Sequence, residues 1–234
     1  MANSNPNEYL GLSTRSKEGP RFATGQGRYT DDFTEPGMLQ AVFIRSPHAH
    51  ARILGVEAQD ALNRQDVFAV VTPEDIKRDT RPFRPGRYAA GLKTPIEEYA
   101  GAVDKVRYVG EPLGAIAARD RSTAEDVLES ITVDYEILPA ITDVHQAVAG
   151  ENPSLIYEEL GANLAWQGNL EYGDTEKAFR ESDRTVRENL KIHRYSSTPL
   201  EPLACIASFD RFSRKLTVRT NTQVPENIYD ALPL

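Results

Sequence analysis

Short apolar runs bounded by glycine and proline recur along the first half of the chain. The runs MLQAVFIRS, VFAVV and LGAIAA are rich in β-branched and other apolar residues, and they predict strands. Thr72 followed by Pro73 predicts a helix start, because Thr is a good N-cap and Pro fits the first helical position. The alternation of strands with short helices over residues 20–145 predicts an α/β (α+β mixed) fold.

The segment RSTAEDVLESI predicts one of these helices. Ser122 and Glu125 match a capping box, so the sequence places the helix start there. The apolar positions recur at helical spacing and share one face. They are Ala124, Val127, Leu128 and Ile131.

The pattern becomes less regular after residue 145. Residues 146–165 carry Gly and Pro with little periodicity, which is typical of a linker. Asp174 predicts the N-cap of an amphipathic helix, and the alternating run RTVRENLKIHRYSS predicts a strand. A hairpin is expected to turn at Asp210–Arg214. The resulting organisation is an N-terminal arm over 1–18, a first domain over 19–145, the linker, and a second domain over 166–234.

Composition narrows the function classes. The 234 residues carry a net charge of −8, are 40% hydrophobic and lack a basic run, which argues against nucleic-acid binding. The single cysteine excludes an internal disulfide framework and any cysteine-based iron–sulfur or zinc cluster built by this chain alone. No apolar stretch approaches the ~20 residues of a spanning helix, and the first residues lack a signal-peptide pattern. We expect a cytoplasmic protein without membrane contact.

Some residues suggest chemistry but have simpler structural explanations. His48 and His50 have the spacing of one strand face, which can suit a metal, although no third ligand lies nearby. Cys205 lies in the apolar run LACIASF and is interpreted as a small core residue. Glu111 is interpreted as part of a turn. Glu201 either lines a distant cavity or is a polar residue in a rigid turn.

The segment 77–101 is rich in Pro, Gly and Arg, and it predicts a long loop. Its arginines, within 78–87, either form a docking surface for an anion or a subunit or are simply solvated. The glycines of GQGRYT and YVGEPLG do not form a G-x-G-x-x-G dinucleotide fingerprint, and no G-x-S-x-G elbow is present.

Three stretches, in this order, resemble a known family: GRYTDDFTEPGMLQAVFIRSPHAHARI, YVGEPLGAIAARDRSTAEDVLESITVDYEILPAITD and HRYSSTPLEPLACIASFDRFSRKLTVRTNTQVP. They are similar to the molybdopterin-binding subunit of the xanthine dehydrogenase, aldehyde oxidase and aerobic carbon monoxide dehydrogenase family. The resemblance implies that residues 19–145 are the family's a/b hammerhead domain. Residues 166–234 would be the N-terminal portion of the first molybdopterin-binding domain.

The resemblance also implies a function. Such enzymes hydroxylate a carbon centre or oxidise carbon monoxide with oxygen from water, using a molybdenum–molybdopterin cofactor. Electrons then pass to 2Fe-2S clusters and FAD on other subunits. Aldehyde, purine, nicotinate-like heterocycle and carbon monoxide all stay open as substrates.

One pair of residues matches a family site. Thr222-Gln223 corresponds to a Thr-Gln pair after a strand, in which the glutamine amide contacts an oxo ligand of molybdenum, and Thr222 is only its neighbour. An amide donor can orient and polarise such a group. The alternative is a glutamine at the end of a hairpin that bonds to backbone.

The family's next elements, a Gly-Gly-Phe-Gly loop and a later general-base glutamate, do not occur in this sequence. We therefore expect a subunit fragment, split or truncated, that is inactive alone. It would work with the remaining molybdopterin-domain polypeptide, an iron–sulfur subunit and an FAD subunit. Unpaired strand edges and exposed apolar surface are expected near 195–234. A non-catalytic α/β subunit-interaction or assembly module is the alternative function.

Overall fold

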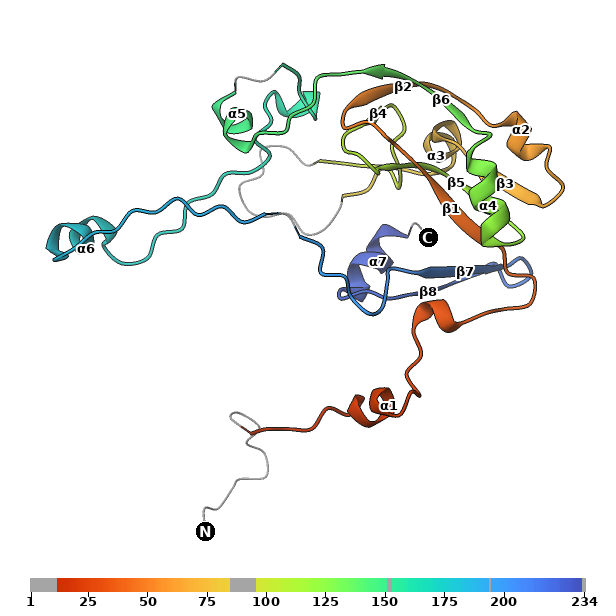
Figure 1. Cartoon of the computed structure of the whole chain (residues 1–234), viewed down its shortest axis with the longest axis horizontal. Helices are drawn as coiled ribbons and strands as arrows, with labels where there is room; N and C mark the ends of the chain where they lie inside the picture. Colours follow the sequence, from red (N-terminus) through yellow and green to blue (C-terminus); the bar gives the residue numbers. More distant parts are fainter. Residues whose placement is uncertain (1–11, 85–95, 151–152, 194, 233–234) are drawn as a thin grey trace, which may run out of the picture. The chain divides into compact units, whose positions relative to one another are not determined.

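A computed structural model describes residues 12–84, 96–150, 153–193 and 195–232 of the chain (Figure 1). The helices are α1 Gly19–Ala23, α2 Gln59–Leu62, α3 Pro73–Asp79, α4 Arg121–Leu128, α5 Val144–Ala149, α6 Thr175–Glu181 and α7 Pro225–Ala231, with 3-10 turns η1 Thr30–Asp32 and η2 Glu158–Leu160. The strands are β1 Gln40–Arg45, β2 Ala51–Glu57, β3 Val67–Val71, β4 Lys105–Val106, β5 Pro112–Ala118, β6 Thr132–Ile137, β7 Cys205–Asp210 and β8 Lys215–Thr220. The predicted mixed α/β class is confirmed.

The described residues divide into two compact units. The described residues within 37–191 and 224–232 belong to one unit, which we call the α/β unit; those within 12–36 and 192–223 belong to the other, which we call the hairpin unit. This division follows contacts in space and not the order of the chain. The predicted domain boundaries at 18, 145 and 165 stay predictions.

Two three-stranded antiparallel sheets build the α/β unit, in the orders β1-β5-β3 and β4-β2-β6. Strand β5 lies at the centre of the first sheet because its run PLGAIAA is apolar on both faces. Gly114 is required there: a Cβ atom at this position would lie 2.3 Å from the backbone oxygen of Val71 on β3. The glycine therefore allows the close approach of β5 to β3.

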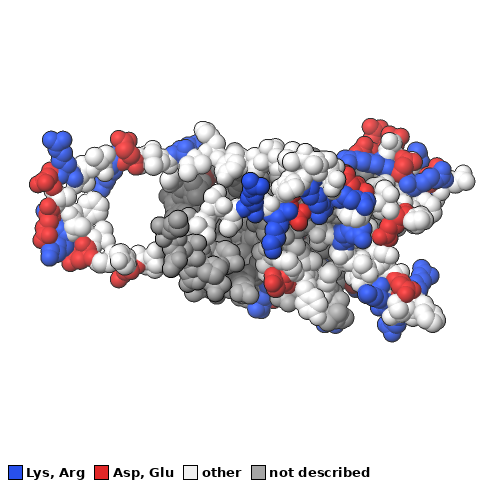
Figure 2. Space-filling view, turned by 90° about the horizontal axis from the view of Figure 1, so that it is seen from below, with Lys and Arg blue, Asp and Glu red and all other residues white. Residues whose placement is uncertain are grey.

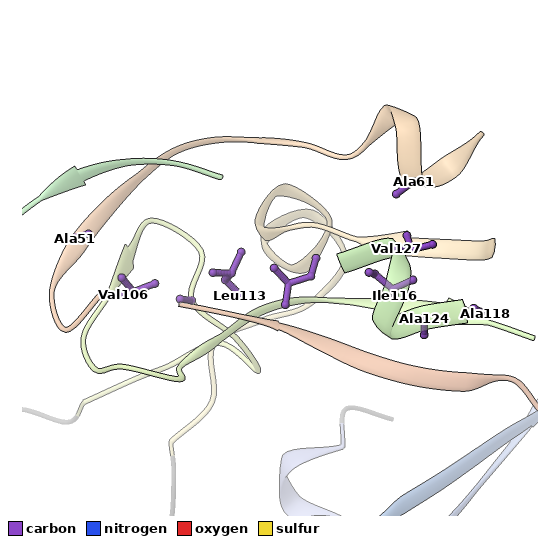
Figure 3. Packing of buried hydrophobic residues seen from close by; sticks show 10 residues of the cluster. Ala51, Ala61, Val106, Leu113, Ile116, Ala118, Ala124 and Val127 are labelled. Atoms are coloured by element: carbon purple, nitrogen blue, oxygen red, sulfur yellow. The ribbon is translucent and has the colours of Figure 1, made fainter. Parts of the chain in front are cut away.

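A single apolar cluster joins both sheets to the helices. Leu113 and Ile116 of β5 are fully buried, and Figure 3 shows Ile116 beside Val127 of α4. Val106 of β4 belongs to the same cluster, so the second sheet shares this core. The remaining buried members are Ile44, Ala51, Ala61, Ala102, Ala118 and Ala124.

Side-chain caps fix the helix starts. Thr72 caps α3 as predicted: its hydroxyl accepts the backbone N–H of Asp75, whose carboxylate accepts the N–H of Thr72 at 2.9 Å. The prediction for α4 was wrong by two residues. Asp120 caps this helix by accepting the N–H of Thr123 at 2.8 Å, and Glu125 instead pairs with Arg121 at 2.7 Å. An aspartate is a strong N-cap, and it precedes the serine in the chain.

The long loop expected over 77–101 is shorter at its start, because α3 extends to Asp79. Residues 85–95, with Arg87, lie outside the described residues. Arg78 pairs with Asp75 and Asp79 at 2.8 and 2.6 Å, and Arg84 pairs with Glu97 at 2.9 Å. These arginines therefore neutralise neighbouring carboxylates.

The region before the hairpin has little structure of its own. Asp174 caps α6 as predicted, by accepting the N–H of Lys177 at 2.8 Å. The strand predicted from RTVRENLKIHRYSS was wrong: its described residues form no strand and are all exposed. Alternation alone does not make a strand, because the backbone groups need a pairing partner.

Candidate cofactor-binding segment

The site predicted from sequence lies at the end of a β-hairpin. Strands β7 and β8 pair in register from Cys205 opposite Thr220 to Asp210 opposite Lys215. The turn falls at Asp210–Arg214, as predicted. Hydrogen bonds from the Ser213 side chain and the Phe212 N–H hold the pKa of Asp210 below its ordinary value. Asp210 thereby fixes the turn, and the hairpin sets where the chain leaves β8.

Asn221 anchors the first residue after β8. Its side-chain oxygen accepts the N–H of Ala204 at 3.1 Å, and its amide nitrogen donates to the carbonyl of Pro202 at 3.1 Å. The hydroxyl of Thr220 donates to the carbonyl of Ala204 at 2.9 Å. The segment that leaves β8 is thus tied to the segment that enters β7. The sequence does not single out Asn221, because its two partners lie 17 and 19 residues earlier in the chain.

Thr222 and Gln223 follow this anchor and precede α7, so both lie in the connection between β8 and a helix. The side chain of Gln223 is exposed, two residues after Asn221, whose bonds tie the start of this connection to the segment that enters β7. A neutral amide donor at a fixed position suits an oxygen acceptor of a bound group. The donor chemistry at Gln223 therefore fits the molybdenum cofactor that the family resemblance implies. Its role as a cofactor contact stays a prediction.

The N-terminal part of the hairpin unit packs on residues close to this site. Phe33 lies between two guanidinium groups: Arg28 Cζ is 4.4 Å and Arg219 Cζ is 4.3 Å from its ring centroid. Glu201 accepts the N–H of Thr30 at 3.2 Å and lies 3.4 Å from its hydroxyl. The carboxylate of Glu201 therefore holds η1, which favours the structural interpretation over a cavity-lining role.

His48 and His50 both make structural contacts in this fold. His50 is buried at 2% exposure, and its Nδ1 lies 2.9 Å from the carbonyl oxygen of Pro139, so Nδ1–H donates there. His48 meets the ring of Tyr135 edge-on at 4.9 Å. Within the described ranges, no group of three His, Cys, Asp or Glu side chains could hold a metal ion.

Cys205 is exposed, which corrects its assignment to the core. It lies on β7 of a two-stranded sheet, and two strands alone do not enclose a core. Glu111 is buried as a turn residue, and it accepts the backbone N–H of Arg107. Burial raises the pKa of the Glu111 carboxyl above its ordinary value, against the opposing effect of Arg107.

The expected apolar exposure is confirmed in the hairpin unit. Phe209 and Phe212 are 58% and 99% exposed, and Leu216 is 49% exposed. Strands β7 and β8 pair only with each other in the described part of the chain, so each has one unpaired edge. Such surface is typical of an element that another layer covers.

Charge on the described surface is mixed. Helix α6 carries both signs, with Lys177 and Arg180 each one turn from a glutamate, and Figure 2 shows the alternating colours at its left end. Among the described helices, none combines the length and the apolar character that crossing a bilayer requires.

Comparison with known proteins identifies the family. The a/b hammerhead domain of aldehyde oxidase and xanthine dehydrogenase matches residues 24–139, and a molybdopterin cofactor-binding domain matches residues 156–232. The carbon monoxide dehydrogenase large chain of Afipia carboxidovorans is 31% identical over 96% of this chain and 29% of its own length. The nicotine 6-hydroxylase large subunit of Paenarthrobacter nicotinovorans is 29% identical over 96% of this chain and 27% of its own.

A solved structure gives the same result. Quinoline 2-oxidoreductase from Pseudomonas putida 86 superimposes with a TM-score of 0.78 and 30% identity, over 92% of this chain and 27% of the other. The chain thus spans less than a third of the length of these relatives. The chain belongs to the aldehyde oxidase and xanthine dehydrogenase family, and it corresponds to the N-terminal part of that family's molybdopterin-binding subunit.

Proposed function

We propose that this chain is one part of a molybdenum hydroxylase, which oxidises a small organic substrate or carbon monoxide with oxygen taken from water. The observation that carries the proposal is the order of the two matched domains, hammerhead and then molybdopterin-binding, along a single chain. The same matches leave the alternative, a non-catalytic interaction or assembly module, without support of its own.

The chain's own contribution to chemistry is placement. The molybdenum–molybdopterin cofactor, when bound, supplies the redox chemistry. Gln223 contacts the cofactor through its side-chain amide, which donates a hydrogen bond. Thr222 is the adjacent residue, and its contact with the cofactor is the weaker part of the proposal. Asn221 and Thr220 tie the start of the loop to Pro202 and Ala204. A donor that is fixed before binding loses less entropy when the cofactor arrives.

We propose that the rest of the cofactor site lies outside these 234 residues. The chain covers 29% of the carbon monoxide dehydrogenase large chain, and we propose that a partner supplies the remaining molybdopterin domain. We also propose that an iron–sulfur subunit and an FAD subunit carry the electrons onward, and that the chain alone is inactive. The cytoplasmic location stays a prediction.

Co-expression tests this function. The chain is produced alone and together with a polypeptide that carries the remainder of the family's large subunit, and molybdenum is measured in each purified product. We expect molybdenum and substrate oxidation only in the complex. Molybdenum and unaided turnover in the isolated chain would contradict the proposal.

A variant pair tests the role of Gln223 in that complex. Gln223→Ala is expected to keep the molybdenum content but lower kcat by about 10- to 100-fold, the usual effect of removing a group that orients a metal's ligands. The matched control is Gln167→Ala, since Gln167 is also exposed. Equal kcat in both variants would remove Gln223 from the site without affecting the assignment of the family.

A further inference from the structure

Residues 153–163, which we call the strap, include the start of the molybdopterin-binding match at residue 156 and make polar contacts with strand β4 and nearby loops of the α/β unit. The central contact is Lys105 of β4, whose ammonium lies 2.8 Å from both carboxylate oxygens of Glu158 and 3.2 Å from the carbonyl of Leu155. One cation therefore holds the segment through a side chain and through the backbone.

The two charges of this pair differ in their surroundings. The side chain of Lys105 is 7% exposed, whereas that of Glu158 is 60% exposed. An ammonium buried to this degree has lost most of its hydration, and it depends on the carboxylate and the carbonyl to replace it. Glu158 retains water on its other side. Loss of the partner is therefore costly for the lysine and mild for the glutamate.

Residues that precede Glu158 in the chain support the same attachment. The hydroxyl of Tyr157 bonds to the carboxylate of Glu98, and the guanidinium of Arg107 lies 4.8 Å from the Tyr157 ring centroid. Burial and the Glu98 carboxylate both raise the pKa of the Tyr157 hydroxyl, so this hydroxyl remains a donor. The first residues of the segment are held as well, because the hydroxyl of Ser154 donates to the carbonyl of Pro139 at 2.6 Å.

The strap also has hydrogen bonds within itself. Asn163 accepts the N–H of Ile156 at 2.9 Å and donates to the carbonyl of Ser154 at 2.9 Å, which closes the segment into a loop. The N–H of Leu160 donates to Tyr157 within η2. A segment that is closed on itself and attached at three points can leave the sheet as one piece.

We infer that the strap is held on the α/β unit as a single piece, and that its ion pair with the buried ammonium of Lys105 keeps it attached. The strap fixes where the chain enters the cofactor-binding match, which begins at residue 156. It can open locally without unfolding the core, because its contacts are polar and lie outside the apolar cluster. This inference does not depend on the proposed function.

Hydrogen exchange on the whole chain tests the strap. The backbone amides of Ile156 and Leu160 report on the strap, and that of Ile116 on β5 reports on the core. In Glu158→Gln the strap amides are expected to exchange on the order of tenfold faster than in the wild type, since the buried ammonium loses its counter-charge. Lys105→Met, which removes the buried charge at similar volume, is expected to have a smaller effect.

The control is Glu159→Gln, which changes the exposed neighbouring glutamate of η2 and is expected to leave the strap amides unchanged. If Lys105→Met accelerated exchange of the strap amides as much as Glu158→Gln or more, the proposed role of the buried Lys105 ammonium would be contradicted. Wild-type exchange in Glu158→Gln would do the same. If Glu158→Gln accelerated amide exchange at Ile116 as much as at Leu160, the strap would open only with the core and the inference would fail.

Discussion

The core of the α/β unit and the stretch 165–193, most of which belongs to the same unit, differ in how far their apolar side chains are buried. In the α/β unit, Leu113 and Ile116 are fully buried and two sheets share one core. In the stretch 165–193, every residue is exposed, with Leu170 and Tyr172 both at 96%. Yet both regions carry ordinary apolar side chains, and both match domains of one enzyme family.

The difference shows that an apolar pattern specifies a fold only when its partner is present. Strand β5 has neighbours on both sides within the same unit. The alternating run after Asp183 has none among the described residues, so its side chains have nothing to pack against. We expect the core of the α/β unit to determine the stability of the chain. The stretch 165–193 is expected to determine its association with other polypeptides.

The largest expected effect is the loss of a core side chain. Ile116→Ala leaves a cavity at the centre of the buried cluster, and it should lower the free energy of unfolding by about 2–5 kcal/mol. The matched control is Ile192→Ala, because Ile192 is 87% exposed. Urea denaturation measures both. A similar loss in the two variants would contradict the distinction between the regions.

A smaller loss is expected at the cap of α3. Thr72→Ala removes the acceptor for the N–H of Asp75, and it should cost about 1 kcal/mol of stability. Thr72→Ser retains the hydroxyl and should recover most of that loss. The same denaturation experiment measures both variants. A Thr72→Ser variant no more stable than Thr72→Ala would show that the methyl group of Thr72 contributes more to stability than its capping hydroxyl.

Burial of Glu111 predicts a pH effect of known sign. The pKa of Glu111 is raised in the folded state, so the protonated carboxyl adds to the free energy of unfolding below the ordinary pKa of a glutamate. This contribution is lost as the pH rises through the raised pKa. Glu111→Gln should therefore gain stability relative to the wild type between pH 4 and pH 7, a window that begins at about the ordinary pKa. Denaturation midpoints over this range measure the difference, and a constant difference would contradict the direction of the shift.

The smallest effect on folding is expected in the exposed stretch. Leu170→Ser should change the free energy of unfolding by less than about 0.5 kcal/mol, because the side chain is already in water. It should nevertheless reduce self-association of the chain, which sedimentation velocity measures. Unchanged association together with a clear loss of stability would show that Leu170 is packed.

Local signals in the sequence were sufficient where the partner lies nearby in the chain. The cap at Thr72, the cap at Asp174 and the turn at Asp210–Arg214 each depend on residues within a few positions. The prediction for Ser122 failed because a better cap, Asp120, lies two residues earlier.

Long-range partners could not be predicted. Cys205 was assigned to a core because its run is apolar, but whether a strand is buried depends on layers that its own residues do not specify. The bonds of Asn221 to residues 202–204 and the contact of Lys105 with Glu158 join segments far apart in sequence. The position of Gln223 after a strand was predictable only from the resemblance.

Hydrogen exchange along the whole chain tests the central claim most directly, measured first on the chain alone and then with a polypeptide that carries the remainder of the family's large subunit. In the isolated chain, the amides of β1 and β5 should be the most protected, and those of 165–193 should exchange at nearly the rate of an unfolded peptide. Addition of the second polypeptide should protect 165–193 and leave β5 unchanged. Protection of 165–193 equal to that of β5 in the isolated chain would contradict the claim.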